Sequence, residues 1–580
     1  MNREQVEEMT VEVQTRLLES RKPGSMWRGH LSSSAISTAV SVFALYLIDK
    51  QKYALQIKKG ADWLKHTMRA EGAWGDSAES PANMTATLLS YAALYAVDSP
   101  PQAAKAYLRS KFGGEGEEQL IKGVLDYYGK DLTFSVPILS MCGLAGIVSQ
   151  WNKIPPFPFE LAVLPQKFFR FLQLPVVSYA IPALIAVGIL RYKKGGNGIL
   201  SPIRNLFIPK CLQVLKKLQP VDGGFLEAAP LTAFVGMCMC GAGYREHGVT
   251  QKAAQFLIDT VREDGAWPID TDLASWVTSL SLRALDEDIP ERHFFIDKLK
   301  ANALKEVHPF TGAQPGGWGW TDLSGSVPDA DDTPGALIAL HVLTGGIYSE
   351  EIGNGVKWLM DLQNRDGGIP TFCKGWTKLP FDQSSPDLTA HAFYAFELWK
   401  NKLPNDLRKR CESSEKRMCE FMERVQTEEG AWIPLWFGDQ DSPDEHSPVY
   451  GTATAVDYFA TSQDLKVREL ALKGLNYLLS VQNPDGGWGG AKGVASKVTL
   501  TARTLAALAS YREVNDEVIE RGFDYLYQLY QQGEIYRPEP IGLYFARLWY
   551  SEELYNLTFL LSALKRIRKY RIIITNHESI

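Results

Sequence analysis

Cysteine is scarce in this sequence, and positive charge is not in excess. The 580 residues include seven cysteines, of which only Cys238 and Cys240 lie close together. A lone C-x-C pair lacks the paired spacing of a zinc site, and an odd, scattered set does not indicate a disulfide framework. Lysine and arginine number 61 and acidic residues 67, so the formal net charge of −6 gives no reason to expect nucleic acid as a partner. We expect a reduced, intracellular protein.

The sequence also lacks a clear membrane-spanning segment. The first ten residues, MNREQVEEMT, have no apolar core of a signal peptide. Charge-free runs at 31–48, 132–152 and 172–190 approach the length of a transmembrane helix. However, the first run is rich in Ser and Thr, and the other two contain proline. We therefore predict that they are buried inner helices of a large all-α protein.

One pattern recurs along the chain. In KGLNYLLSVQNPDGGW, which ends at Trp488, a glutamine follows an apolar helical segment, and an acidic Gly-Gly turn leads to an aromatic residue. Such self-similarity is typical of repeat architectures. Seven copies occur: four keep the glutamine, at Gln219, Gln363, Gln426 and Gln482, and weaker copies end at Trp74, Trp267 and Tyr536.

Each copy predicts a helix, a reversal of the chain and an aromatic that packs back onto the helix. The glutamine amide is suited to hydrogen-bond neighbouring backbone and so to tie helix pairs together. Apolar segments such as TPGALIALHVLTGG lie between the copies, and strand-type alternation is absent. The sequence therefore predicts an all-α fold in which helix pairs are stacked round a ring, an α/α toroid.

Three carboxylates occupy four positions in VPDADDTPG, at Asp329, Asp331 and Asp332. Pro334 suits the first turn of a helix, and Asp332 or Thr333 would then cap it. Three acids that share a site cannot all ionise cheaply, so one pKa rises and that group keeps its proton. From these residues alone, a helix cap, a metal-binding loop and a protonated carboxyl all stay open. A metal site would need further convergent ligands, and the nine histidines are dispersed.

A second group of polar residues lies downstream. In SPDLTAHAF, Asp387 and His391 stand four residues apart, a spacing that brings two side chains together on one face of a helix. A cationic histidine would help a neighbouring acid because it stabilises the carboxylate left after proton transfer. Tyr450 follows in VYGTATA.

The repeat pattern Lys/Arg-Gly…Gln…Gly-x-Trp, known as the QW repeat, resembles that of the squalene–hopene and oxidosqualene cyclases, which are class II terpene cyclases. The resemblance extends from about residue 31 to about residue 561. It implies two α/α barrels in a dumbbell with an apolar cavity between them. Residues 1–25 and 290–580 would form the catalytic barrel, and residues 26–289 an inserted second barrel. The polar stretch DEDIPER near 290 fits such a boundary.

The resemblance also assigns roles. The three aspartates match the D-x-D-D (DXDD) motif, so Asp331 would be the proton donor, with Asp329 and Asp332 as its supports. The D-x-x-x-H match makes His391 the partner that raises the acidity of Asp331, and Asp387 the group that keeps His391 charged. The match of VYGTATA to Y-G-T-G suggests that Tyr450 helps to order the water that reprotonates Asp331.

Aromatic residues make up 11% of the chain. Their π-faces stabilise a cyclising carbocation without acting as nucleophiles. The positions that match the family's cavity lining are Trp276, Trp320, Phe372, Trp436, Tyr544, Phe545, Trp549, Tyr550 and, in SYAIPA, Tyr179. Within the family, the segments SPANMTATLLSYAAL, GGIPTFCKGW and PIGLYFARLWYSEELY look most like those of the tetraprenyl-β-curcumene cyclases, or sporulenol synthases, which make sesquarterpenes.

The implied substrate is an apolar polyprenoid, such as squalene or tetraprenyl-β-curcumene, and its cyclisation needs no cofactor and no metal. The resemblance implies a cytoplasmic, monotopic protein peripheral to the cytoplasmic membrane, with 192–210 as the membrane-contact segment, and it leaves room for a homodimer. Two alternatives stay open. One is cyclisation of a shorter prenyl alcohol or of a prenyl diphosphate, which would call for Mg²⁺. The other is a catalytically idle toroid that binds a lipid or a protein.

Overall fold

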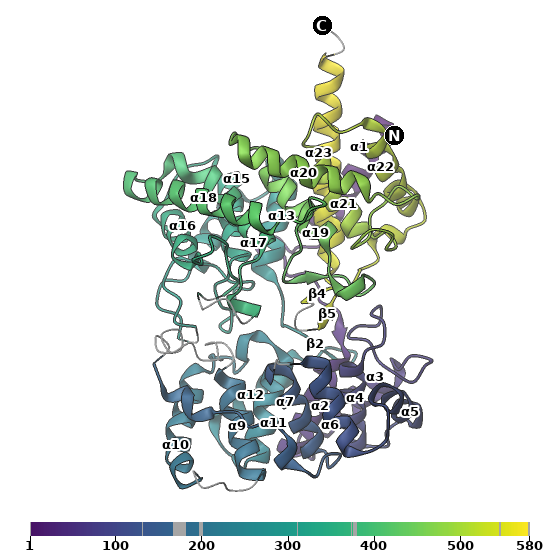
Figure 1. Ribbon diagram of the computed structural model, residues 1–580, viewed down its shortest axis with the longest axis vertical. Coiled ribbons are helices and arrows are strands. Elements are labelled where there is room, and N and C mark those ends of the chain that lie inside the picture. The colour runs from purple at the N-terminus through teal and green to yellow at the C-terminus, as the bar shows by residue number, and fades with distance from the viewer. Residues whose placement is uncertain are drawn as a thin grey trace.

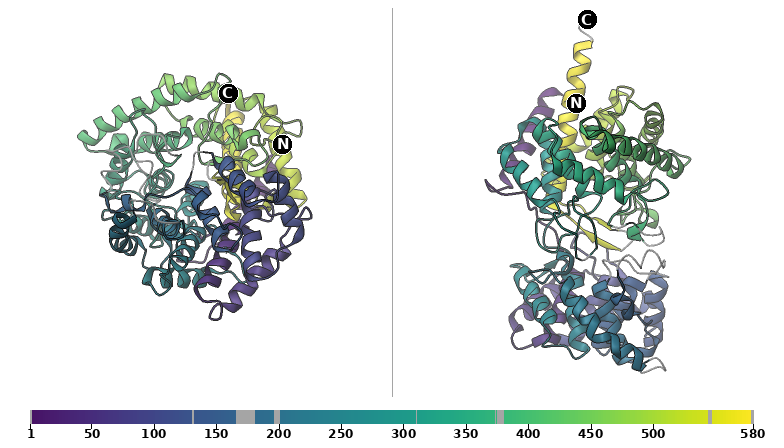
Figure 2. Two further views of the ribbon diagram at one scale, coloured as in Figure 1. Left: turned by 60° about the horizontal axis from the view of Figure 1, so that its bottom comes forward. Right: turned by 90° about the vertical axis from the view of Figure 1, so that its left-hand side faces the viewer.

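The computed structural model describes residues 2–129, 132–165, 181–195, 201–309, 311–372, 374, 380–543 and 547–577. Its helices form two groups stacked one upon the other, with short strands between them (Figures 1 and 2). The strands are β1 (Ser33–Ser34) and β2 (Trp267–Pro268), which pair antiparallel, and β3 (Phe437–Gly438), β4 (Ile541–Leu543) and β5 (Leu548–Tyr550), which form an antiparallel sheet in that order. The predicted all-α fold is confirmed.

Six inner helices form a closed ring in the upper group of Figure 1, because each contacts the next and the last contacts the first. They are α13 (Ala274–Leu285), α15 (Asp332–Thr344), α17 (Pro386–Trp399), α19 (Pro448–Phe459), α21 (Val498–Leu508) and α23 (Glu553–His577). Outside them lie α1 (Arg3–Glu19), α14 (Arg292–Asn302), α16 (Glu350–Leu362), α18 (Asn405–Val425), α20 (Leu465–Ser480) and α22 (Asp516–Gln531).

The lower group repeats the arrangement with five inner helices in the described part of the chain. They are α2 (Ala35–Asp49), α4 (Met84–Val97), α7 (Leu132–Leu144), α9 (Ile181–Lys194) and α11 (Ala229–Gly241). Outer helices are α3 (Ala54–His66), α5 (Gln102–Phe112), α6 (Glu117–Tyr128), α10 (Ser201–Leu218) and α12 (Gly248–Thr260). Because inner helices are enclosed, residues 35–48 of α2, all of α7 and the first ten residues of α9 carry no charged side chain, as the long uncharged runs predict. In the described ranges, no helix is both long and apolar enough to cross a membrane.

The glutamine of each full repeat ties one outer helix to the next. The Gln363 amide donates to the carbonyl of Gly367 at 2.7 Å and to that of Ser414, in α18, at 3.0 Å. The same pair of bonds is made by Gln219, Gln426 and Gln482. Gly367 adopts a φ of +92°, and a Cβ there would lie 2.2 Å from the carbonyl oxygen of Arg417, so the turn admits only glycine.

The tryptophans of the repeats point back to the preceding outer helix. Each indole Nε1 donates to a carbonyl ten residues earlier at 2.7–2.9 Å, in the pairs Trp74–Leu64, Trp267–Leu257, Trp432–Met422 and Trp488–Leu478. Trp27 makes the same bond to Leu17 at 2.7 Å, and Trp318 makes one to Leu299 at 2.6 Å across a longer loop. The sequence analysis missed these two copies because neither has the glutamine, and Trp318 also lies farther from its helix than the other tryptophans do.

The boundary between the barrels differs from the predicted one. One hydrophobic core combines residues 6–31 with residues 276–567, and the other takes residues 35–267. Core membership therefore changes near residues 31–35 and 267–276, rather than at 25/26 and 289/290. The reason is that α13 is needed to close the ring of six, so the polar stretch near 290 joins α13 to α14 within one barrel.

Replacing Gln363 with leucine should destabilise the fold. Gln363 is buried, and the Ser414 hydroxyl donates to its Oε1 at 2.8 Å. The change therefore leaves this hydroxyl and the carbonyls of Gly367 and Ser414 without their hydrogen-bond partner. We expect a loss of about 2–4 kcal/mol, measured by urea unfolding. Gln463→Leu is the matched control, because Gln463 is exposed, and its effect should stay within about 0.5 kcal/mol. Equal stability of the two variants would contradict the role of the amide.

Candidate active site

A cavity of about 350 Å³ lies between the two barrels and takes its walls from both cores. Most of its wall is apolar. From the lower barrel it is lined by residues such as Ile36, Leu89 and Phe134, and from the upper barrel by Asp329, Asp331, Asp332, Trp276, Trp320, Phe372, Trp436, Tyr550 and Tyr555. The D-x-D-D aspartates thus face an apolar space.

Asp329, rather than Asp332 or Thr333, caps helix α15. Its Oδ1 accepts hydrogen bonds from the backbone N–H groups of Asp331 and Asp332, each at 2.8 Å. Thr333 instead bonds through its hydroxyl to the backbone of Trp318. The predicted cap was wrong by one turn because the chain before Asp332 is already coiled, and only a residue two or three positions earlier can reach the free N–H groups.

Asp329 and Asp332 form a buried carboxyl pair. Both side chains are almost inaccessible, at 4% and 5% exposure. Burial, and next the negative charge of Asp329, raise the pKa of Asp332 well above its usual range. Burial raises the pKa of Asp329 as well, although its two backbone donors favour the ionised form. Burial and the charge of Asp329 therefore both favour the protonated form of Asp332.

Asp331 turns away from this pair towards His391. Its Oδ1 lies 2.7 Å from His391 Nδ1, within hydrogen-bond distance. The side chain of Asp331 keeps 22% exposure and lines the cavity, whereas that of His391 keeps 3%. Burial lowers the pKa of His391, while Asp331 acts in the opposite direction. The ring of His391 stacks on Tyr458 at 4.6 Å, so its orientation is fixed.

Asp387 does not hold His391 as the i, i+4 spacing predicts. Its Oδ1 accepts from the hydroxyl of Ser385, and its Oδ2 is buried without a hydrogen-bond partner. Asp387 lies in the first turn of α17, where its carboxylate folds back towards the residue that precedes the helix, whereas the imidazole leans across to α15. Burial, and to a lesser degree Asp331, raise the pKa of Asp387 to about 6.

Tyr450 is buried in the first turn of α19. Its ring lies 4.8 Å from that of Phe437, and the Arg503 guanidinium lies 4.3 Å above it. Burial raises the pKa of Tyr450 well above its usual value, and the charges of Asp331 and Asp387 act in the same direction. The role of Tyr450 in ordering a water stays a prediction.

Four aromatic rings from separate segments form one cluster at the cavity wall. Phe372 contacts the rings of Trp320, Phe381 and Trp436 at 6.1, 5.8 and 5.4 Å, and Phe381 contacts Trp436 at 5.4 Å. Phe381 was missed by the sequence analysis. The only sign of Phe381 in the sequence is that an aromatic residue stands between the two family-like segments that hold Phe372 and Asp387.

A second aromatic group lies at the start of α13 and α23. Tyr555 accepts from Trp276 Nε1 at 3.1 Å, and its hydroxyl lies 3.0 Å from that of Tyr550. Tyr555 also lines the cavity and was missed. It stands at the end of the predicted segment PIGLYFARLWYSEELY, whose Tyr550 also lines the cavity.

Trp549 does not line the cavity within the described part of the wall. Its neighbours Leu548 and Tyr550 do, because successive side chains of strand β5 point to opposite faces. The backbone N–H of Trp549 donates to Asp76 at 2.6 Å, and its side chain is 1% exposed. Tyr179, Tyr544 and Phe545 lie outside the described residues.

No group of three or more His, Cys, Asp or Glu side chains in the described ranges is arranged to hold a metal ion. The three D-x-D-D carboxyls do not converge on one point, since Asp329 faces the helix N-terminus and Asp331 faces His391. That the reaction needs no cofactor stays a prediction.

A carboxyl–imidazole pair at the wall of an apolar cavity between two α/α barrels is the arrangement of class II terpene cyclases. Comparison with known proteins agrees. A model of the squalene-hopene cyclase N-terminal domain matches residues 11–111, and one of the C-terminal domain matches residues 307–569. Together they span more than half of the chain. The chain belongs to the squalene–hopene cyclase family.

Individual relatives are distant. A squalene–hopene cyclase of Bradyrhizobium diazoefficiens is 22% identical, over 83% of this chain and 82% of that protein. Enfumafungin synthase efuA of Hormonema carpetanum is 24% identical over 91% of this chain, but the chain spans only 46% of its length. Among solved structures, the ent-copalyl diphosphate synthase from Streptomyces platensis has a TM-score of 0.58 at 16% identity, over 97% of this chain and 99% of that one. This likeness shows the fold.

Replacing Asp387 with asparagine should change how stability depends on pH. The folded protein raises the pKa of Asp387 from about 4 to about 6, so it binds the proton more tightly than the unfolded chain. The stability that Asp387 contributes to the wild-type fold is therefore fully present below about pH 4 and is lost as the pH rises to about 6. Relative to wild type, Asp387→Asn should gain about 3 kcal/mol between pH 4 and pH 7, measured by urea unfolding.

The matched control is Asp361→Asn. Lys357 and Arg410 bond to Asp361 and hold its pKa below the usual value, so this variant should show no such gain. If the difference in stability between Asp387→Asn and wild type did not vary with pH, the raised pKa of Asp387 would be contradicted.

Proposed function

We propose that this protein is a protonation-initiated cyclase that converts a polyprenoid into a polycyclic terpenoid. The observation that carries the proposal is the 2.7 Å contact between Asp331 and His391 at the wall of the apolar cavity. Family membership supports it. An idle binding scaffold would gain nothing from a buried acid–imidazole pair, whose desolvation costs stability.

Asp331 transfers its proton to a carbon of a terminal alkene, and the other alkene carbon becomes cationic. The N–H of His391 then stabilises the Asp331 carboxylate that is left behind. Each ring closes when the next double bond attacks the cation. The cluster of Trp320, Phe372, Phe381 and Trp436 presents π-faces to the moving charge, each of which is worth about 0.5–2 kcal/mol to a cation.

The preferred substrate is a neutral polyprenoid rather than a diphosphate. None of the described residues that line the cavity is a lysine or an arginine, and a diphosphate needs cations or a metal to offset its charge. Squalene and tetraprenyl-β-curcumene both suit an apolar wall. The sequence segments favour the second, whose product is a sesquarterpene.

The membrane contact that we propose is on α10. Ile203 and Leu206 are 55% and 78% exposed, although both are large apolar side chains. Arg204 between them bonds to Glu160 and anchors the helix to the lower barrel. Exposed apolar residues of this kind suit a protein that takes its substrate from a lipid surface in the cytoplasm. Ile199 and Leu200 lie outside the described residues, and a homodimer stays a prediction.

Leu206→Glu should weaken binding to phospholipid vesicles, because a charge replaces the most exposed apolar side chain of α10. Co-sedimentation with vesicles of bacterial lipid measures it, and we expect at least about a fivefold lower bound fraction. Leu465→Glu is the control, because Leu465 is 82% exposed on α20 of the other barrel. Equal binding by both variants would refute the contact.

Asp331→Asn should abolish cyclisation while the fold stays intact. Asparagine has no proton to give to an alkene, so we expect the rate to fall at least about 10³-fold. The purified protein is incubated in mild detergent with squalene, tetraprenyl-β-curcumene, shorter polyprenyl alcohols and polyprenyl diphosphates, and the products are identified by mass spectrometry.

Asp361→Asn serves as the control, because it removes one carboxylate of the same barrel at the surface. Conversion at the normal rate by Asp331→Asn would show that the donor is another group. No conversion of any of these compounds by wild-type enzyme would favour the binding scaffold, and turnover of diphosphates alone with Mg²⁺ would favour a prenyl diphosphate cyclase.

A further inference from the structure

A fourth carboxyl group lies in the cavity wall, apart from the D-x-D-D motif. Of the described lining residues, Asp270, Asp329, Asp331 and Asp332 carry carboxyl groups, and the last three belong to one turn. Asp270 comes from another wall, in the segment between β2 and α13. A carboxyl group in a mostly apolar wall, outside the D-x-D-D turn, has no packing purpose, because its burial costs free energy.

Asp270 is held among the cation-binding aromatics. Its Oδ1 accepts a hydrogen bond from Trp320 Nε1 at 3.2 Å. Trp320 is part of the aromatic cluster, and its carbonyl also accepts from the backbone N–H groups of Ser275 and Trp276 at 2.8 and 3.2 Å. The carboxyl of Asp270 is therefore fixed next to the rings that face the substrate.

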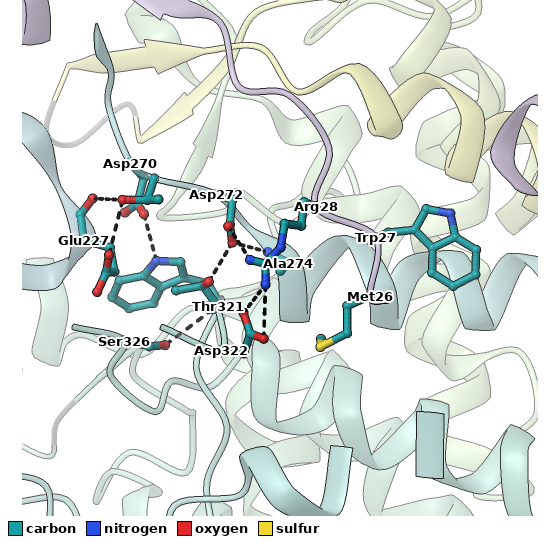
Figure 3. A network of polar contacts seen from close by, with 12 residues as sticks. Met26, Trp27, Arg28, Glu227, Asp270, Asp272, Ala274, Thr321, Asp322 and Ser326 are labelled. Carbon is teal, nitrogen blue, oxygen red and sulfur yellow. Dashed lines mark hydrogen bonds and ion pairs between the residues drawn. The ribbon is translucent and has the colours of Figure 1, made fainter. Parts of the chain in front are cut away.

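A second acidic side chain, that of Glu227, lies next to Asp270. Figure 3 shows Glu227 beside Asp270, while Asp272, two residues further on, lies with Arg28. Glu227 is 1% exposed and accepts from the N–H of Gly325 at 2.6 Å and from the Thr271 hydroxyl at 3.2 Å. It adopts a φ of +55°, a conformation that costs a residue with a side chain about 1–3 kcal/mol, and strained backbone of this kind concentrates at functional sites.

The charges and hydrogen bonds around Asp270 suit its action as a proton acceptor. Burial and then the charge of Glu227 raise the pKa of Asp270 well above its usual range, while the N–H groups of Trp320 and Thr271 favour its carboxylate. A positive charge in the cavity also favours the carboxylate. A carboxylate with a raised pKa is a stronger base than an exposed one.

We propose that Asp270 ends the cyclisation as the base that takes up the last proton. This rests on the proposed function. A C–H bond beside the final cationic carbon breaks, its electron pair forms the new double bond, and the proton goes to a carboxylate oxygen of Asp270. If a water adds to the cation first, an O–H bond breaks instead and the same oxygen takes the proton. One proton enters from Asp331 and one leaves to Asp270, so the deprotonation needs no other reactant, whereas the second route consumes one water. Proton exchange with solvent then returns both carboxyls to their starting state.

Asp270→Asn tests the assignment, because asparagine keeps an oxygen for Trp320 but cannot take the proton. The substrate is whichever polyprenoid the wild-type enzyme converts. We expect Asp270→Asn to consume it still, since Asp331 and His391 are untouched. The share of the wild-type main product should fall at least about tenfold, and products quenched at other positions should replace it.

Asp272→Asn is the matched control. Asp272 lies in the same segment, pairs with Arg28 at 2.6 Å and is not among the described lining residues, so its variant should keep the wild-type product ratio. An unchanged ratio in Asp270→Asn, or a folded Asp270→Asn that consumes no substrate, would overturn the proposal. If Asp270→Asn fails to fold in a thermal melt, Asp270→Ser takes its place under the same expectation. Failure of the wild-type enzyme to cyclise any polyprenoid would refute the proposed function instead.

Discussion

The contact between Asp331 and His391 depends on how the inner ring of the upper barrel is built. Asp331 directly precedes α15, and His391 lies in the second turn of α17. Trp276, Tyr450 and Tyr555 likewise lie in the first turns of α13, α19 and α23. The N-terminal ends of the inner helices thus meet around the polar groups of the site. Helix N-termini carry partial positive charge, which stabilises a carboxylate formed there and so helps Asp331 to give up its proton.

This arrangement has a cost in stability. Asp332 Oδ1 and Asp387 Oδ2 are buried without hydrogen-bond partners, and burial raises the pKa of both carboxyls. Such groups destabilise the fold, and perturbed pKa values of this kind concentrate at active sites. The repeats offset the cost with bonds far from the chemistry, because the glutamine and tryptophan side chains link each outer helix to its neighbour.

The aromatic cluster depends on the closed ring of the upper barrel. Trp320, Trp436 and the pair Phe372 and Phe381 come from three loops widely separated in sequence, and they contact one another only because the ring brings those loops to the same end. A cation that moves during ring closure must find a π-face at each stage, so the positions of the rings relative to Asp331 decide where closure stops. The proposed base, Asp270, is tied to this cluster through Trp320.

Much of this protein is determined by the sequence itself. The repeats predict the helix pairs and their turns, since a glycine at positive φ and a reaching glutamine act locally, and D-x-D-D with His391 predicts the acid and its partner. Tertiary structure alone decides which side chains meet. It makes Asp329 the cap, turns Asp387 to Ser385 instead of His391, points Trp549 away from the cavity and brings Asp270 into its wall. These outcomes depend on side-chain direction and on contacts between distant segments, which residue spacing does not encode.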